Sequence, residues 1–264
     1  MDDEDPRPGG TDDGGDLLSR RTLVGGLAVG LTGAGVVYGA SRLGSGADGG
    51  ETTVDMRASD RTVTLAESGS GTVSVDLAGN PIAGAAGPAV TAYYWSDFQC
   101  PFCARFERET FPKLVENYVV PGTLQVVFLQ LPYIGADSRT AARAAKCVWR
   151  QVHESAPDRY WDWHTRVFEE QGSERSGWAS RENLLGITGE VEGIDAGAVG
   201  TCLDDDAEAV AASVAADRSL AETFGIGGTP GFVLRNTGSG AMGRITGAQP
   251  YERFESAIEQ IREA

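Results

Sequence analysis

The sequence predicts an α/β fold, and three observations support this prediction. Runs rich in β-branched and aromatic residues recur along the chain, the strongest at 88–95 and 124–129. Segments with the apolar spacing of helices separate these runs, and a last helix is expected to start near Pro250. The 264 residues, 41% of them hydrophobic, suffice for one large domain with a buried core.

The composition is strongly acidic. The chain has 22 Lys and Arg against 38 Asp and Glu, a formal net charge of −16, which argues against a general nucleic-acid binder. Lys113 and Lys146 are the only lysines, and every other basic residue is an arginine. Many acids with scarce lysine are typical of the proteins of halophiles, whose high net charge keeps them soluble in strong salt. The alternative is an ordinary acidic protein.

The N-terminal region, residues 1–42, is predicted to be a targeting segment rather than part of the folded domain. Its acidic, Gly-rich start cannot form a core, so we expect it to be disordered. Arg20 and Arg21 then precede an uncharged, Gly-rich stretch at 22–41 that resembles a twin-arginine export signal. A single membrane-spanning helix is the alternative, since about 20 residues can just cross a bilayer. An export signal that is not cleaved would also serve as a membrane anchor. Either interpretation places the folded domain outside the cytoplasm.

Two further segments complete the expected organisation. Residues 43–60, rich in Gly, Ser and Asp, are predicted to be a flexible linker. Residues 61–264 are predicted to be the folded domain, starting with short strands at 61–65 and 72–77.

The cysteines suggest redox chemistry rather than metal binding. A structural zinc site would need a second close pair or a His pair, and the spacing of the four cysteines and two histidines supplies neither. Half a zinc site at the first pair remains an alternative. An even number of cysteines in an exported chain favours disulfides. The cysteines are Cys100, Cys103, Cys147 and Cys202.

The C-x-x-C motif lies where a strand candidate, 88–95, runs into a helical pattern. At a helix N-terminus, unpaired N–H groups and the helix dipole stabilise a thiolate on the first cysteine, Cys100. Pro101 suits the first helical turn, where its missing donor costs nothing. Cys103 would lie close enough to resolve a mixed disulfide on Cys100. Pro112 is expected to kink the helix near its middle.

The residues around the motif resemble a known family. The run from Ser96 to Cys103, SDFQCPFC, is similar to the active site of DsbA-like thiol oxidoreductases of the thioredoxin superfamily. Further landmarks follow in the family's order: the strand at 124–129, an Ala-rich helix near 141–147, an aromatic helix near 160–168 and a Thr-Pro loop before a strand. The resemblance implies a thioredoxin-like sheet from about Ala89, interrupted by a helical insertion at about 137–220.

The resemblance also implies roles for residues far from the motif. In the family, the proline corresponding to Pro230 is cis and packs beside the active-site disulfide, and the Thr229 backbone would bind an extended substrate peptide. An ordinary loop proline is the alternative. Some members carry a second, structural disulfide in the insertion, which implies a Cys147–Cys202 bond. The alternatives are two unpaired buried thiols or a relay to the first pair.

Two departures from the family bear on the active site. Many relatives have a carboxylate six residues before the first cysteine, where this chain has Tyr94, and Asp97 is expected to point elsewhere. Relatives with histidine between the cysteines use its charge to stabilise the thiolate, which Phe102 cannot do. The helix N-terminus would then lower the Cys100 pKa largely alone, and we expect a less oxidising couple than in those relatives. His164 is interpreted as a packed side chain.

By resemblance, the chain would donate its disulfide to exported proteins with free thiols through attack at an exposed Cys100. A quinone-linked membrane partner of the DsbB or vitamin-K-epoxide-reductase-like type would reoxidise it, with no bound cofactor and no metal. Three other functions stay open: a disulfide reductase or isomerase of the same fold, a non-catalytic thioredoxin-like binding module, and a glutathione-dependent isomerase. Export and the intact C-x-x-C disfavour the last.

Overall fold

The structure is a computed structural model that describes residues 56–57, 62–66, 72–77 and 79–264. The predicted export signal or anchor at 1–42 and most of the predicted linker at 43–60 lie outside the described residues. Within the described ranges, no helix combines the length and the hydropathy needed to cross a bilayer.

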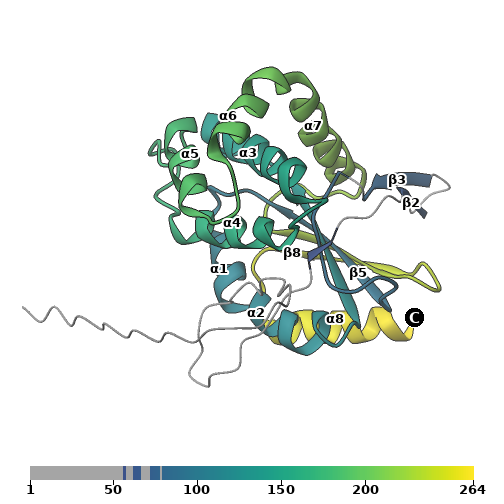
Figure 1. The fold of residues 1–264 in the computed structure, drawn as a ribbon. Helices are drawn as coiled ribbons and strands as arrows, with labels where there is room; N and C mark the ends of the chain where they lie inside the picture. Colours follow the sequence, from purple (N-terminus) through teal and green to yellow (C-terminus); the bar gives the residue numbers. More distant parts are fainter. Residues whose placement is uncertain (1–55, 58–61, 67–71, 78) are drawn as a thin grey trace, which may run out of the picture. The chain divides into compact units, whose positions relative to one another are not determined.

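A six-stranded mixed sheet forms the centre of the described fold, with strand order β1-β4-β6-β5-β7-β8 (Figure 1). β5 is parallel to β6 and antiparallel to β7. β2 and β3 pair with each other in a separate antiparallel hairpin. The bounds of the strands are β1 Met56–Arg57, β2 Thr62–Ala66, β3 Thr72–Asp76, β4 Ile82–Ala83, β5 Val90–Ser96, β6 Leu124–Gln130, β7 Gly231–Asn236 and β8 Met242–Thr246.

All seven residues of β5 are buried, because helices cover both faces of the sheet. Side chains alternate between the faces along each strand. Tyr94 and Phe232 point to one face of the sheet, and Tyr93 and Trp95 point to the other. The first face packs on α1 (Pro101–Glu109), α2 (Phe111–Leu114) and α8 (Tyr251–Glu263), and the second is covered by α7 (Ala207–Thr223). The strand that leads to the cysteines is therefore fixed from both sides.

The C-x-x-C helix is interrupted where the sequence predicts a kink. α1, Pro101–Glu109, ends before Thr110, and α2, Phe111–Leu114, continues into a π-helical turn at Val115–Val119. Pro112 has no N–H to donate, which accounts for the break. α8, Tyr251–Glu263, packs beside this helix and buries Phe254 and Ile258.

Five helices between β6 and β7 form the insertion (Figure 1), of which α4 (Asp158–Glu169) packs on the sheet face that carries Phe128 and α7 packs on the face that carries Trp95. The expectation of an α/β sheet interrupted by helices is confirmed. The helices are α3 Ala136–Val152, α4 Asp158–Glu169, α5 Arg181–Glu190, α6 Ala196–Asp205 and α7 Ala207–Thr223.

Part of the segment predicted to be a linker, 43–60, forms a short strand instead. Met56 and Arg57 form β1, which pairs with β4 at the sheet edge. Met56 is 1% exposed and its N–H donates to Asp158 Oδ1 at 3.1 Å. The burial of Met56 and the pairing of β1 with β4 hold this segment in place. Composition alone predicts a linker here because it carries no information about such contacts.

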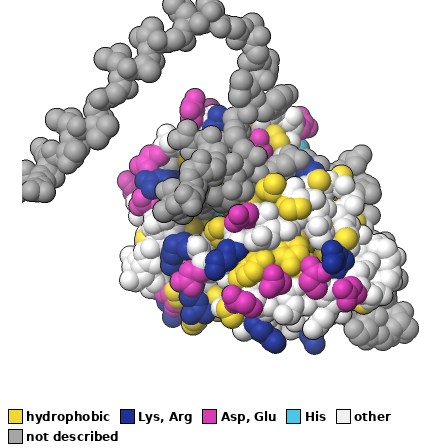
Figure 2. Space-filling model, turned by 90° about the horizontal axis from the view of Figure 1, so that it is seen from below, with side chains coloured by type: hydrophobic (Ala, Val, Ile, Leu, Met, Phe, Trp, Pro, Cys, Tyr) yellow, Lys and Arg dark blue, Asp and Glu magenta, His cyan; other side chains and the backbone are white. Residues whose placement is uncertain are grey.

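Seen from the side of α8, hydrophobic side chains gather in the middle of the surface, with basic and acidic side chains around them (Figure 2). Lys and Arg alternate with Asp and Glu there. The described side chains visible in this view therefore form no continuous basic area.

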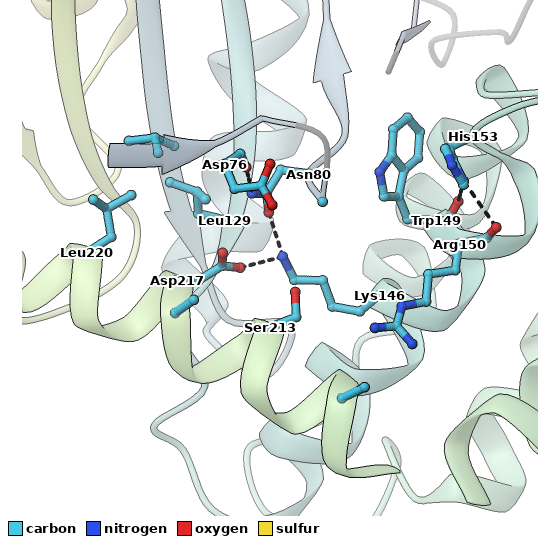
Figure 3. A pocket seen from close by; sticks show the side chains of 14 residues that line it. Asp76, Asn80, Leu129, Lys146, Trp149, Arg150, His153, Ser213, Asp217 and Leu220 are labelled. Carbon is cyan, nitrogen blue, oxygen red and sulfur yellow. Dashed lines mark hydrogen bonds and ion pairs between the residues drawn. The ribbon is translucent and has the colours of Figure 1, made fainter. Parts of the chain in front are cut away.

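A buried ion pair joins the insertion to the sheet (Figure 3). Lys146 Nζ on α3 lies 2.7 Å from Asp217 Oδ2 on α7, and it also donates to the side-chain oxygen of Asn80. The Gln130 N–H on β6 donates to the same Asp217 oxygen at 2.9 Å. Burial raises the pKa of Asp217, and Lys146 opposes that rise. The pair thus ties two insertion helices to β6 and to the segment before β4.

Lys146→Met is expected to lower the free energy of unfolding by about 3 kcal/mol, because it leaves the buried Asp217 carboxylate without its counter-charge. Urea unfolding measures the loss. The matched control is Lys113→Met at the only other lysine, which is exposed and should cost less than about 1 kcal/mol. Equal losses in the two variants would contradict this role for the buried pair.

Candidate active site

Cys100 is the N-cap of α1, and its sulfur sits at the helix N-terminus. Its backbone is extended, with φ −76° and ψ 117°, and Pro101 begins the helix. The Cys100 carbonyl accepts the first helical hydrogen bonds, from Cys103 N–H at 3.0 Å and Ala104 N–H at 3.2 Å. The N–H groups of Phe102 and Cys103 are among the groups that lower the pKa of the Cys100 thiol. The motif thus occupies the place that the sequence predicts for it.

The Cys100 thiol is strongly acidic, with its pKa lowered from 9.0 to about 6. The hydrogen bond from the Cys103 thiol is the largest cause, and the side chain of Thr229 and the two backbone N–H groups add to it, whereas burial opposes it. The expectation that the helix N-terminus acts largely alone therefore leaves out the larger contribution of Cys103. Both cysteines are free thiols in this structure.

Cys103 is the inner cysteine, with no exposed surface. Burial and the neighbouring Cys100 raise the pKa of its thiol well above 9.0. The pair is therefore unequal: Cys100 is a thiolate at neutral pH and Cys103 keeps its proton. Such asymmetry suits one sulfur to act as leaving group and the other to resolve a mixed disulfide.

The Thr229–Pro230 loop lies directly against Cys100. The peptide bond between Thr229 and Pro230 is cis, and Cys100 Sγ lies 3.3 Å from the Thr229 carbonyl oxygen, to which the thiol donates when it is protonated. Gly231 follows as the first residue of β7, where a Cβ would lie 2.9 Å from the Gly228 carbonyl oxygen. The structure thus brings together two segments that are 129 residues apart in the sequence.

Cys100 is not exposed as the sequence-based mechanism assumes: its exposed fraction is 1%. The Tyr133 hydroxyl lies 3.9 Å from its sulfur, the same atom that the Thr229 carbonyl oxygen contacts. Phe102, by contrast, is 53% exposed, with the Arg105 guanidinium 5.2 Å from the centre of its ring. Groups on two loops therefore contact the reactive sulfur, while an aromatic side chain beside it faces solvent.

The sequence does not single out Tyr133 as a site residue. Hydrogen bonds from buried polar side chains hold the loop that carries it. The buried Asp97 carboxylate accepts hydrogen bonds from the N–H groups of Gln99, Tyr133 and Ile134, at 2.9, 2.9 and 3.1 Å. The Gln99 amide donates to the Ile134 carbonyl at 3.0 Å. Asp97 thus serves the loop after β6 rather than the thiol, in agreement with the expectation that it points elsewhere.

A second buried polar group lies one helical turn beyond Cys103. The Glu107 carboxylate is 3.0 Å from His164 Nε2, and His164 has no exposed surface. Aromatic rings pack around this histidine, which agrees with its interpretation as a packed side chain. Tyr94, also fully buried, has its pKa raised by burial and by the nearby Glu107 and Cys103, so its phenol stays protonated. Tyr94 therefore does not replace the carboxylate that many relatives have there.

The other two cysteines lie within the insertion. Cys147 on α3 and Cys202 on α6 form a disulfide that spans 55 residues of sequence. Among the described residues, no group of three or more His, Cys, Asp and Glu side chains is arranged to hold a metal ion. The Gln171 amide, after α4, donates to the Phe98 and Cys100 carbonyls at 2.6 and 3.1 Å, so the insertion also contacts the active-site loop.

Sequence comparisons place these features among known proteins. A family model described as Thioredoxin matches residues 77–260. The disulfide bond formation protein D of Bacillus subtilis (strain 168) is 32% identical over 110 residues, which are 42% of this chain and 47% of that protein. The probable disulfide bond formation protein D of Bacillus anthracis is 30% identical over 96 residues, 36% of this chain and 42% of that protein. The match thus spans less than half the length of either relative.

Structural comparisons extend the likeness over most of the described fold. The oxidised BdbD of Bacillus subtilis has a TM-score of 0.63 at 24% identity, covering 77% of this chain and 99% of that one. A thioredoxin-like oxidoreductase from Silicibacter pomeroyi DSS-3 has a TM-score of 0.57 at 26% identity, covering 70% of this chain and 94% of that one. The helical insertion is therefore part of a thioredoxin-like fold that these proteins share.

Proposed function

Because this chain belongs to the thioredoxin family, we propose that it is a thiol:disulfide oxidoreductase that donates a Cys100–Cys103 disulfide to exported proteins. One observation carries the proposal: an acidic thiol at a helix N-terminus lies against a buried thiol on one side and the cis-Pro230 loop on the other. The two Bacillus relatives are named as disulfide bond formation proteins, which supports the same chemistry here.

The reaction proceeds by two thiol–disulfide exchanges. A substrate thiolate attacks Cys100 Sγ of the oxidised pair, the Cys100–Cys103 bond breaks, and its electron pair leaves on Cys103, which takes up a proton. A second substrate thiolate then attacks the substrate sulfur of the mixed disulfide, and Cys100 leaves as a thiolate. The substrate gains a disulfide and loses two electrons, and the enzyme gains both. We assign Thr229 and Pro230 to hold the substrate backbone beside Cys100.

Donation is favoured over reduction because the low pKa of Cys100 stabilises the reduced enzyme and makes Cys100 a good leaving group. The reductase or isomerase uses the same residues in the opposite direction. A binding module would have no need of one acidic and one buried thiol in contact.

Equilibration of the full-length protein with glutathione buffers in high salt tests the proposal. A potential near about −120 to −180 mV supports an oxidase or isomerase, and one near about −270 mV would identify a reductase. Cys100→Ser should abolish exchange without unfolding the protein. Absence of any reversible couple in the wild-type protein would leave the binding module as the answer.

We further propose that residues 1–42 direct the domain at 61–264 out of the cytoplasm by a twin-arginine route, with 22–41 as signal or membrane anchor. The Cys147–Cys202 disulfide supports an oxidising compartment. A quinone-linked membrane protein would reoxidise the pair. Fractionation of cells that express Arg20→Lys/Arg21→Lys tests the route, since the variant protein should stay in the cytoplasm.

A further inference from the structure

The exchange mechanism assigns no role to Tyr133, a side chain on the loop after β6. Tyr133 is 53% exposed, yet its hydroxyl lies 3.9 Å from the Cys100 sulfur, a long hydrogen bond to a sulfur atom. We propose that Tyr133 is a catalytic residue whose hydroxyl donates a hydrogen bond to the Cys100 thiolate, in place of a charge at position 102. The proposal rests on the proposed function, and it adds a residue to that site.

The backbone around Tyr133 is fixed in the direction that this contact needs. The Asp97 carboxylate binds the N–H groups of Tyr133 and Ile134, and the Gln99 amide binds the Ile134 carbonyl and Ser138 Oγ at 3.0 and 3.1 Å. Asp97 and Gln99 are each 1% exposed, so water competes little for these bonds. Because both lie within three residues of Cys100, the loop that carries Tyr133 is fastened to the segment that carries the sulfur.

The hydroxyl also has the right protonation state. Burial raises the pKa of Tyr133, the Thr229 side chain opposes this rise and the neighbouring Cys100 adds to it, so the hydroxyl keeps its proton at the neutral pH at which Cys100 is a thiolate. The titratable groups that face it are Cys100 and the inner Cys103. A neutral donor to a thiolate stabilises the charged form and lowers the pKa of that thiol.

The contact matters most when Cys100 leaves. In the second exchange the electron pair of the mixed disulfide ends on Cys100 Sγ, and the Tyr133 hydroxyl is already directed at the atom where this charge develops. No proton moves in the step. The same hydrogen bond stabilises the reduced enzyme over the oxidised one, which makes the pair a stronger disulfide donor.

Tyr133→Phe tests the proposal, because it removes the hydroxyl and keeps the ring. The Cys100 pKa, followed by thiolate ultraviolet absorbance in the reduced protein, should rise by about one unit. At pH 8, above both pKa values, the equilibrium constant with glutathione should shift about tenfold toward the oxidised enzyme, about 30 mV for a two-electron couple. The matched control is Tyr251→Phe, which removes a hydroxyl bound to Glu255 on α8 and should change neither value.

The outcomes separate the two proposals. An unchanged Cys100 pKa in a Tyr133→Phe protein that keeps the wild-type melting temperature would overturn the role of Tyr133 and leave the proposed function intact. A wild-type protein with no reversible couple would overturn the proposed function, whereas the pKa measurement, which needs no redox partner, would still report on Tyr133.

Discussion

At pH 7, about nine tenths of the Cys100 side chains in the reduced protein are expected to be thiolates, against about one hundredth for a thiol with the ordinary pKa of 9.0. The ultraviolet absorbance of the thiolate should rise with a midpoint near pH 6, and the rate of alkylation by iodoacetamide should follow the same curve. The lowered pKa, caused first by the Cys103 thiol, is the physical reason.

Two variants check the assignment. Cys100→Ser should remove the transition near pH 6. Cys103→Ala should move it to higher pH, because Cys100 then loses its strongest hydrogen-bond donor. A wild-type midpoint above pH 8 would contradict the expected acidity.

The same shift makes the stability of the reduced protein depend on pH. Between pH 6 and 9 the folded protein holds Cys100 as a thiolate, whereas the unfolded chain still binds the proton, so the free energy of unfolding rises with pH. The contribution is fully present only near pH 9 and is lost as the pH falls through 6. Above pH 9 the raised pKa of Cys103 acts in the opposite direction.

Removal of the Cys147–Cys202 disulfide is expected to lower the free energy of unfolding by about 4 kcal/mol, because the bond closes a loop of 55 residues in the unfolded chain. Cys147→Ala/Cys202→Ala is compared by urea unfolding in a Cys100→Ala/Cys103→Ala background, so that only one pair differs. The disulfide joins α3 to α6, and thiol exchange at Cys100 should persist in the same double variant made in the wild-type background. A loss below about 1 kcal/mol would mean that packing, and not the bond, holds these helices together.

The sequence predicts the parts of the fold that depend on local pattern. The run predicted as a strand at 124–129 forms β6, Leu124–Gln130, and Pro112 lies at the helix break. The approach of Pro230 to Cys100 followed from resemblance, because no local pattern links two residues so far apart in the sequence.

What the sequence does not predict depends on contacts between distant segments. Tyr133 reaches Cys100 only because Asp97 accepts hydrogen bonds from a loop 36 and 37 residues away. Lys146 and Asp217 meet across two helices of the insertion, and neither residue is distinguished by its neighbours in the sequence. Hydrophobic periodicity carries no information about such polar pairings.

The pairing of β5 with both β6 and β7 sets the order in which the sheet can assemble. Along β5, Ser96 pairs with Gln130, whereas Trp95 pairs with Gly231, so the chain leaves the sheet and returns to it at one end of the same strand. Closing the first pairing brings together residues a few tens of positions apart, and closing the second requires well over one hundred. Loop closure therefore delays β7, and the insertion, whose helices contact one another within the segment between β6 and β7, can form its helices and its disulfide before the last strands dock. Cys100 meets Thr229 only in that last step, so a dithiol with its native acidity is a late product of folding.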